Sequence, residues 1–165
     1  MSTSFESDQL RFQVWSTPTN TTVTTTPAVS PDGSRVFVTT SSGLICLSAL
    51  SGSIRWTISV GSPMFSTPLV LVRSEAADSN SVSQYSIYAG ANNFRLYSIN
   101  QTGGIEWSTA VAGPVRSVSG SASRGIVFAG VQYPGRSVFA VNLTDGSIMW
   151  EAGACSARVM SIQVH

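Results

Sequence analysis

The four tryptophans of this chain recur at similar intervals, and no other feature of the sequence constrains the fold as strongly. They are Trp15, Trp56, Trp107 and Trp150, at intervals of 41, 51 and 43 residues. An isoleucine stands two residues before each of the last three tryptophans, and a glycine stands four residues before each, namely Gly52, Gly103 and Gly146. A unit that repeats every 40 to 50 residues, or about that length, is typical of the blades of a β-propeller.

Each repeat unit consists of four short segments separated by turn residues. In the first unit the segments are TPAVS, RVFVTTS, LICLSAL and IRWTIS, with PDG, SSG and SG between them. The second unit is longer because the polar insertion EAADSNSVSQ, residues 75–84, separates its first two segments, and it is predicted to be a surface loop. No segment has a helical pattern. The predicted fold is therefore all-β, a partial β-propeller of three complete four-stranded blades.

The two ends of the chain are expected to carry the first and last strands of a further, incomplete blade. The expected divisions are 1–17 for an N-terminal tail and outer strand, 18–59 for blade 1, 60–111 for blade 2 with its inserted loop at 75–84, 112–153 for blade 3, and 154–165 for the first strand of the incomplete blade. Unpaired apolar strand edges recruit other strands. We therefore expect the chain to be part of a longer propeller, or to pair with copies of itself in an oligomer or filament.

The string AVNLTDGSIMW, residues 140–150, resembles the tryptophan-docking repeat of the quinoprotein-like (PQQ-type) β-propeller family. Ala140, Gly146 and Trp150 match its alanine, glycine and tryptophan position for position. The other two copies depart from it, with Cys46 in the alanine position of the first and Ser98 in that of the second, which is one residue short. In this family the tryptophan lies on the outermost strand and packs against the neighbouring blade. The resemblance implies a structural docking role for the four tryptophans, the three glycines and Ala140.

Quinoprotein dehydrogenases that resemble this repeat hold pyrroloquinoline quinone with adjacent cysteines, acidic calcium ligands and a catalytic aspartate, and no adjacent cysteines occur here. The single histidine is the last residue, His165, so no internal Ser-His-Asp triad is available. Asp32 and Asp145 both precede glycine, which predicts turns. We therefore expect no catalytic residue, cofactor or metal site. The alternative is a fragment or accessory propeller of a quinone-dependent dehydrogenase or another enzyme.

The composition restricts the partners further. The formal net charge is +1 and only 10% of the residues are charged, so no basic patch for nucleic acid is expected. The longest apolar run, Leu69–Val72, is far shorter than the roughly 20 residues of a membrane-spanning helix. The leading hypothesis is a non-catalytic scaffold whose partners are other protein chains.

Three N-x-[ST] sequences make Asn20, Asn100 and Asn142 candidate glycosylation sites. They support a second alternative, a glycosylated extracellular structural protein. The N-terminal residues MSTSFESDQL contain two acids and no apolar run, which predicts no signal peptide. The location of the protein therefore stays open.

Overall fold

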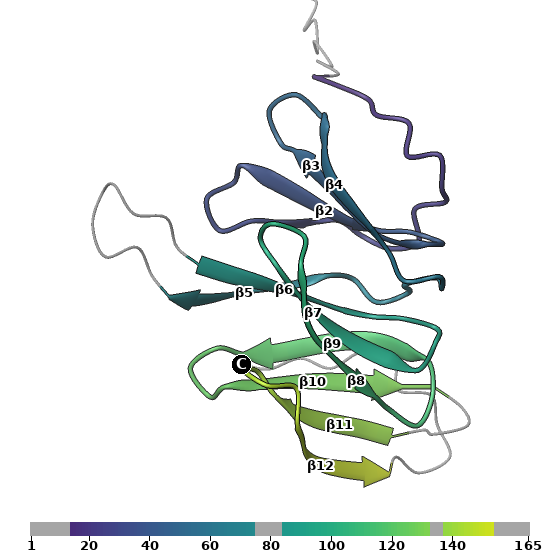
Figure 1. The fold of residues 1–165 in the computed structure, drawn as a ribbon, viewed down its shortest axis with the longest axis vertical. Helices are drawn as coiled ribbons and strands as arrows, with labels where there is room; N and C mark the ends of the chain where they lie inside the picture. Colours follow the sequence, from purple (N-terminus) through teal and green to yellow (C-terminus); the bar gives the residue numbers. More distant parts are fainter. Residues whose placement is uncertain (1–13, 75–83, 133–136, 154–165) are drawn as a thin grey trace, which may run out of the picture.

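The computed structural model describes residues 14–74, 84–132 and 137–153, and these form three four-stranded antiparallel sheets and no helix (Figure 1). Blade 1 consists of β1 (Ala28–Val29), β2 (Arg35–Thr39), β3 (Gly43–Ser48) and β4 (Ile54–Ser59). Blade 2 consists of β5 (Leu69–Ser74), β6 (Gln84–Gly90), β7 (Arg95–Asn100) and β8 (Ile105–Ala110). Blade 3 consists of β9 (Val115–Ser121), β10 (Ile126–Val131), β11 (Ser137–Asn142) and β12 (Ile148–Gly153). The predicted all-β class with three four-stranded units is confirmed.

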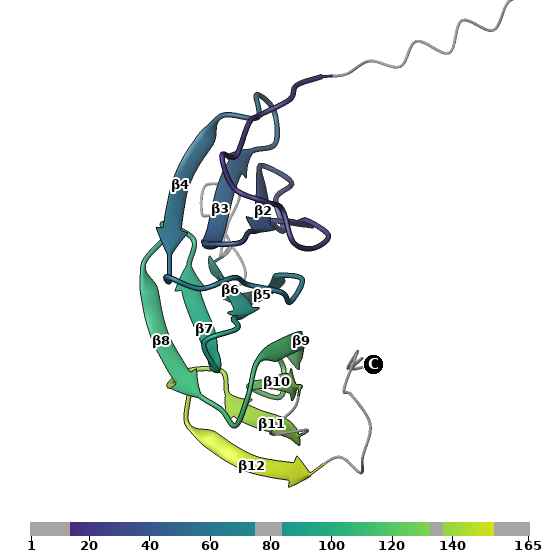
Figure 2. The ribbon, with the colours of Figure 1, turned by 90° about the vertical axis from the view of Figure 1, so that its right-hand side faces the viewer.

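The three sheets lie side by side along an arc, with β4, β8 and β12 on its convex side and β5 and β9 on its concave side (Figure 2). Within each sheet the strands follow one another in chain order, as in a meander. Backbone hydrogen bonds join neighbouring blades near the concave side, from the Met64 amide to the Thr40 carbonyl at 3.0 Å and from the Val115 amide to the Ala91 carbonyl at 3.2 Å. The sheets are therefore fastened to one another by main chain as well as by side chains.

The hydrophobic core lies between the sheets. Successive residues of a strand point to opposite faces, so a sheet with neighbours on both sides is apolar along its whole central strand. All six residues of β3 are buried because blade 2 covers one face of the strand and Trp15 packs on the other. Leu44 and Cys46 belong to the cluster shared with blade 2, while Ile45 and Leu47 belong to a cluster on the opposite face of blade 1. A further cluster fills the junction of blades 2 and 3.

Several expectations fall outside the described residues. The predicted first strand of an incomplete blade, at 154–165, lies entirely there. Of the predicted tail and outer strand at 1–17, only residues 14–17 are described, and none of them is in a strand. Of the inserted loop at 75–84, only Gln84 is described, and it is the first residue of β6.

Candidate interaction site at the blade junctions

In both junctions between complete blades, a tryptophan from the outer strand of one blade covers a glycine turn of the next. Trp56, on β4, donates its Nε1 hydrogen bond to the Gln101 carbonyl at 3.2 Å, and a Cβ built on Gly103 would lie 3.0 Å from the indole. Trp107, on β8, donates to the Leu143 carbonyl at 3.2 Å.

A Cβ built on Gly146 would lie 2.6 Å from the Trp107 indole, and the φ angle of Gly146 is +74°. A left-handed φ and close contact with a neighbouring group both favour glycine. Gly146 therefore satisfies two requirements at once, because its turn is left-handed and the tryptophan lies directly against its Cα.

Trp15 makes the same contacts with blade 1. Its Nε1 donates to the Ala49 carbonyl at 2.8 Å, and a Cβ built on Gly52 would lie 2.5 Å from its indole. The Thr17 hydroxyl donates to the Gly52 carbonyl at 2.6 Å, in the manner in which the Thr109 hydroxyl donates to the Gly146 carbonyl. The difference is that Trp15 comes from a segment outside any strand, not from a complete blade.

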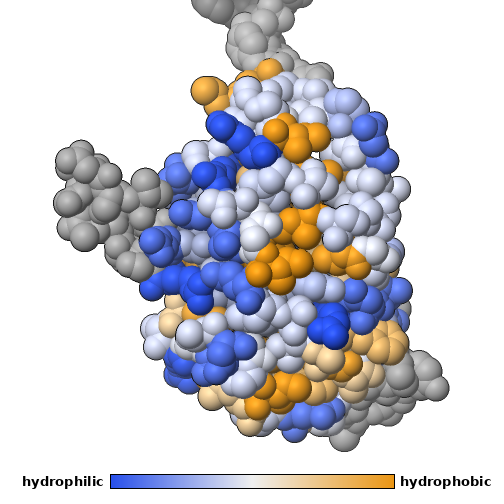
Figure 3. Space-filling view, viewed as in Figure 1, coloured by the Kyte–Doolittle hydropathy of each residue, from blue (hydrophilic) through white to orange (hydrophobic). Residues whose placement is uncertain are grey.

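Trp150 has the position of a docking tryptophan on β12 but no neighbouring turn. Its side chain is 46% exposed, and among the described residues none accepts a hydrogen bond from its Nε1. Ile148 and Met149, beside it on the same strand, are also about half exposed. In Figure 3 apolar side chains are spread along the length of this face, and one group lies at the lower end of the view, where Figure 1 shows β11 and β12. Ile54 and Ile105, the equivalents of Ile148, are exposed to the same degree, so what distinguishes blade 3 is its exposed tryptophan, since Trp56 and Trp107 are partly buried.

The alanine position of the repeat lies directly across the sheet from the tryptophan. Cys46 pairs with Trp56, Ser98 with Trp107 and Ala140 with Trp150. A register shift next to each of these pairs gives the outer strand one extra residue. Such a bulge changes the direction in which the following side chain points. It separates the faces of two residues, such as Ile54 and Trp56, that an unbroken strand would place on one face.

Sequence reasoning missed an aromatic residue on the second strand of each blade, which pairs with the small residue from its other side. These residues are Phe37, Tyr88 and Phe128. Each ring reaches across the small residue to the tryptophan of its own blade, with ring centroids 5.8 to 5.9 Å apart. A small side chain in the alanine position leaves room for this contact. The signal was present in the sequence as an aromatic residue 19 positions before Trp56 and before Trp107.

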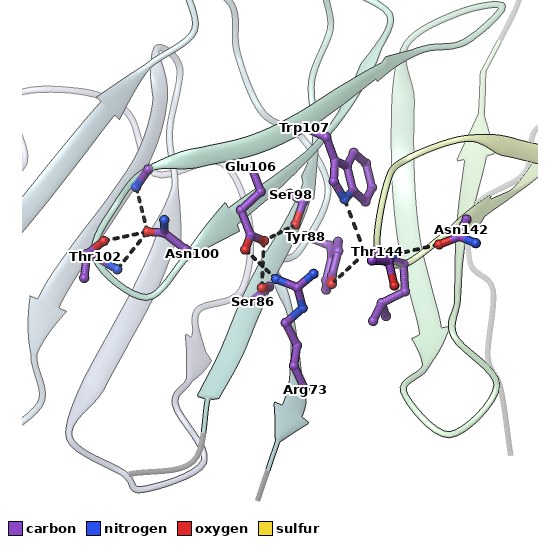
Figure 4. A network of polar contacts seen from close by, with 12 residues as sticks. Arg73, Ser86, Tyr88, Ser98, Asn100, Thr102, Glu106, Trp107, Asn142 and Thr144 are labelled. Carbon is purple, nitrogen blue, oxygen red and sulfur yellow. Dashed lines mark hydrogen bonds and ion pairs between the residues drawn. The ribbon is translucent and has the colours of Figure 1, made fainter. Parts of the chain in front are cut away.

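Blade 2 adds a polar network around Glu106, the extra residue of its bulge (Figure 4). Glu106 accepts hydrogen bonds from the hydroxyls of Ser86 and Ser98, each at 2.8 Å, and forms an ion pair with Arg73. Glu106, Arg73 and Ser86 line a cavity of about 200 Å³. Nearby, burial raises the pKa of the Tyr88 phenol, which lies in the junction with blade 3. The carboxylate is therefore fully engaged in holding three strands of one blade.

Two of the three candidate glycosylation sites lie in the turns that carry the docking glycines. The Asn100 side-chain oxygen accepts hydrogen bonds from the amides of Thr102 and Gly104, at 3.0 and 2.8 Å. The Asn142 side-chain oxygen accepts one from the Thr144 amide at 2.8 Å. Asn20 lies on an exposed position before blade 1. Glycosylation of these residues stays a prediction.

Asp32 and Asp145 lie in tight turns, as their sequence context indicates. Asp32 accepts hydrogen bonds from the Ser30 hydroxyl and the Ser34 amide, and the Ser30 bond is the main cause that lowers the pKa of its carboxyl. Asp145 accepts from the Ser147 amide and hydroxyl, which lower its pKa in the same way. Both carboxylates therefore stabilise turns.

Within the part of the chain that the structure describes, no three side chains of histidine, cysteine, aspartate or glutamate lie together as metal ligands would. Nor does any described segment form a helix of the length and apolarity needed to cross a membrane.

The sequence matches a family model described as outer membrane protein assembly factor BamB, over residues 11–162. The chain belongs to this family. Its repeats are those of a BamB-like, PQQ-type β-propeller, which confirms the resemblance inferred from the docking motif.

Two solved structures are similar to this BamB-like chain. One is the crystal structure of BamB from Moraxella catarrhalis, with a TM-score of 0.65 and 19% sequence identity, covering 85% of this chain and 39% of that one. The other is the computationally designed Ika8 protein, with a TM-score of 0.65 and 12% identity, covering 84% of this chain and 39% of that one. The chain thus spans less than half the length of either protein, and the likeness shows the fold. No curated protein sequence matches the chain.

Proposed function

We propose that this BamB-like chain is a non-catalytic propeller scaffold that binds another protein chain through the face of blade 3 around Trp150. The observation that carries the proposal is the contrast among equivalent tryptophans. Trp56 and Trp107 each have a turn of the next blade to cover, whereas Trp150 is 46% exposed with no acceptor among the described residues. Its partner is either a copy of this chain or the remaining blades of a longer propeller.

The chemistry of this face supports a protein partner. Trp150 and Phe128 form one aromatic pair, and Met149, the extra residue of the bulge, adds a half-exposed apolar side chain beside it. Clustered aromatic and apolar residues at the surface are typical of protein interfaces, in which tryptophan contributes disproportionately to the binding energy. The family description names an assembly factor, which supports a role in bringing protein chains together.

Three of the four described carboxylates support a structural role over a catalytic one. Glu106 is held by two serines and an arginine, and Asp32 and Asp145 accept hydrogen bonds within their own turns. Groups held in this way stabilise strands and turns. The enzyme alternative is tested by adding pyrroloquinoline quinone and Ca²⁺ and removing unbound cofactor. Retained quinone absorbance in proportion to protein would contradict a non-catalytic scaffold.

The binding face is tested by photocrosslinking in the native cell. A photoreactive phenylalanine analogue is placed at Met149 on β12 or, as a control, at Val29 on β1, which is exposed to a similar degree. We expect a discrete crosslinked protein from position 149 and little from position 29. The product should disappear in a Trp150→Ala background. Equal crosslinking from both positions would contradict the proposal.

A further inference from the structure

We infer that the partner of the Trp150 face is blade 1 of a second copy of this chain, and that Trp15 of that copy blocks the binding socket until it is displaced. The socket is defined here as the Ala49 carbonyl, Gly52 and the apolar face of β2 and β3 beneath Trp15. This inference deepens the proposed function and rests on it, because it names the partner chain and the contact that regulates binding.

Blade 1 has the same socket as blades 2 and 3. The cross-strand pair Val36 and Leu47 occupies the register position of Ile87 and Ile99 in blade 2 and of Val127 and Val141 in blade 3. In blades 2 and 3 these pairs pack in the junction with the preceding blade. Blade 1 is apolar at the same positions, although no blade precedes it among the described residues. Its face is therefore built to receive one.

Trp15 fills this socket with a short segment. Together with Val36, it packs on Val38, Ile45 and Leu47, and its hydrogen bond to Ala49 matches the bond from Trp107 to Leu143. Thr17 supplies the second bond of the junction, to the Gly52 carbonyl. A segment outside any strand brings a smaller surface to the socket than the face of a whole blade. The Trp15 contact is thus a replaceable substitute for a blade.

One copy therefore carries both halves of a junction. Trp150 is the equivalent of Trp15 and Trp107 in the repeat, and it stands on a complete blade with its aromatic partner Phe128 in place. Another partner would have to offer a left-handed glycine turn, a carbonyl that accepts the indole hydrogen bond and a matching apolar face, all of which blade 1 has. Contact of blade 3 with blade 1 is head to tail, which generates a ring or a filament.

The short segment that joins Trp15 to blade 1 favours the state in which Trp15 fills the socket. A group held on a short linker competes at an effective concentration on the order of millimolar. Trp15 therefore keeps Trp150 of another copy out of the socket at ordinary protein concentrations. Loss of Trp15 should open the socket and increase self-association.

The test is sedimentation velocity over a concentration series with four variants of the whole chain. We expect Trp15→Ala to lower the concentration at which half of the chains associate by about tenfold or more, which corresponds to roughly 1.4 kcal/mol. The double variant Trp15→Ala/Trp150→Ala should return to weak association. Val14→Ala, next to Trp15, and Glu151→Gln, next to Trp150, are matched controls because both residues are exposed. They should behave as the parent does.

A peptide of residues 14–24 serves as a competitor. Added in excess, it should dissociate the Trp15→Ala assembly, whereas the same peptide with alanine in place of Trp15 should not. If Trp15→Ala fails to fold, Thr17→Val keeps the indole in place and removes one bond to Gly52, so a smaller rise in association is expected.

Three results would overturn the inference: folded Trp15→Ala associating no more than Val14→Ala, association that persists in the double variant, or failure of the peptide to compete. If photocrosslinking at position 149 still captures a different protein in these cases, the proposed scaffold function stands without self-association. If Trp150→Ala changes neither the photocrosslinking nor the self-association, both proposals fail.

Discussion

Trp107 and Trp150 have the same local structure and different surroundings. Each lies across from a small residue, Ser98 or Ala140, and each contacts an aromatic ring of its own blade at 5.8 Å. Trp107 also covers the Gly146 turn, whereas Trp150 is half exposed. The repeat sequence therefore determines the arrangement within a blade by itself, and the neighbouring blade determines whether the tryptophan is buried.

The largest expected effect on stability separates the contribution of contacts within a blade from that of the neighbouring blade. Trp107→Ala should lower the free energy of unfolding by about 3 kcal/mol, because it removes a large side chain from a packed junction. For a chain of this size that corresponds to a fall of roughly 6 to 12 °C in melting midpoint. Trp150→Ala removes a half-exposed side chain and its contact with Phe128, and should cost about 1 kcal/mol. Denaturant unfolding of both variants measures the difference in free energy of unfolding. Equal losses of this free energy would mean that the neighbouring blade adds nothing to the stabilisation by Trp107.

The docking glycine gives the next largest effect. Gly33 and Gly146 both follow an aspartate in a turn and have φ angles of +70° and +74°, so alanine at either position carries backbone strain of about 1 to 2 kcal/mol. Only Gly146 also has an indole 2.6 Å from the added Cβ, while nothing lies within 4 Å of the Cβ at Gly33. Gly146→Ala should therefore destabilise more than Gly33→Ala. Comparable unfolding midpoints would show that the turn conformation, and not the tryptophan contact, requires glycine.

The sequence predicted the repeated part of this molecule and not what varies between blades. Alternating apolar segments with turn residues between them predicted four strands per unit, and the docking motif predicted the family. The second-strand aromatics escaped notice because their partner lies two strands away, a contact that depends on strand register. The Glu106 network was missed for the same reason, since Arg73, Ser86 and Ser98 come from three different strands. The contacts of Trp15 required knowing which turn lies beneath it.

A smaller effect is expected where blade 2 departs from the alanine of the repeat. Ser98→Ala restores the motif residue but removes one hydrogen bond to Glu106, and loss of such a bond to a charged group costs about 1.5 to 3 kcal/mol at most. Because Ser86 and Arg73 still hold the carboxylate, we expect a loss near 1 kcal/mol, which is an ordinary value for one bond. Cys46→Ala in blade 1 is the matched control. A stabilised Ser98→Ala variant would mean that packing at this position outweighs the polar network.

The smallest expected effect on stability is measured by thiol reactivity at the alanine position of the repeat. It compares blade 1, whose outer strand is covered by blade 2, with blade 3, whose outer strand is covered by no described blade. Cys46 is fully buried, and burial raises the pKa of its thiol, so little reactive thiolate forms near neutral pH. In a Cys155→Ser background, Cys46 should react with a thiol reagent only when the junction of blades 1 and 2 opens. A second chain with Cys46→Ala, Cys155→Ser and Ala140→Cys moves the thiol to the equivalent position of blade 3.

Ala140 is also fully buried, so both thiols report opening and not static exposure. Local opening requires less free energy where fewer contacts hold a segment, and β12 has no blade beyond it among the described residues. The thiol at position 140 should therefore react about tenfold faster or more, a ratio that corresponds to a difference of roughly 1.4 kcal/mol in opening free energy. Equal rates would show that the aromatic pair within each blade, and not the neighbouring blade, limits opening. A slower rate at position 140 at high protein concentration, with the expected faster rate on dilution, would show that the edge of blade 3 is covered by another copy.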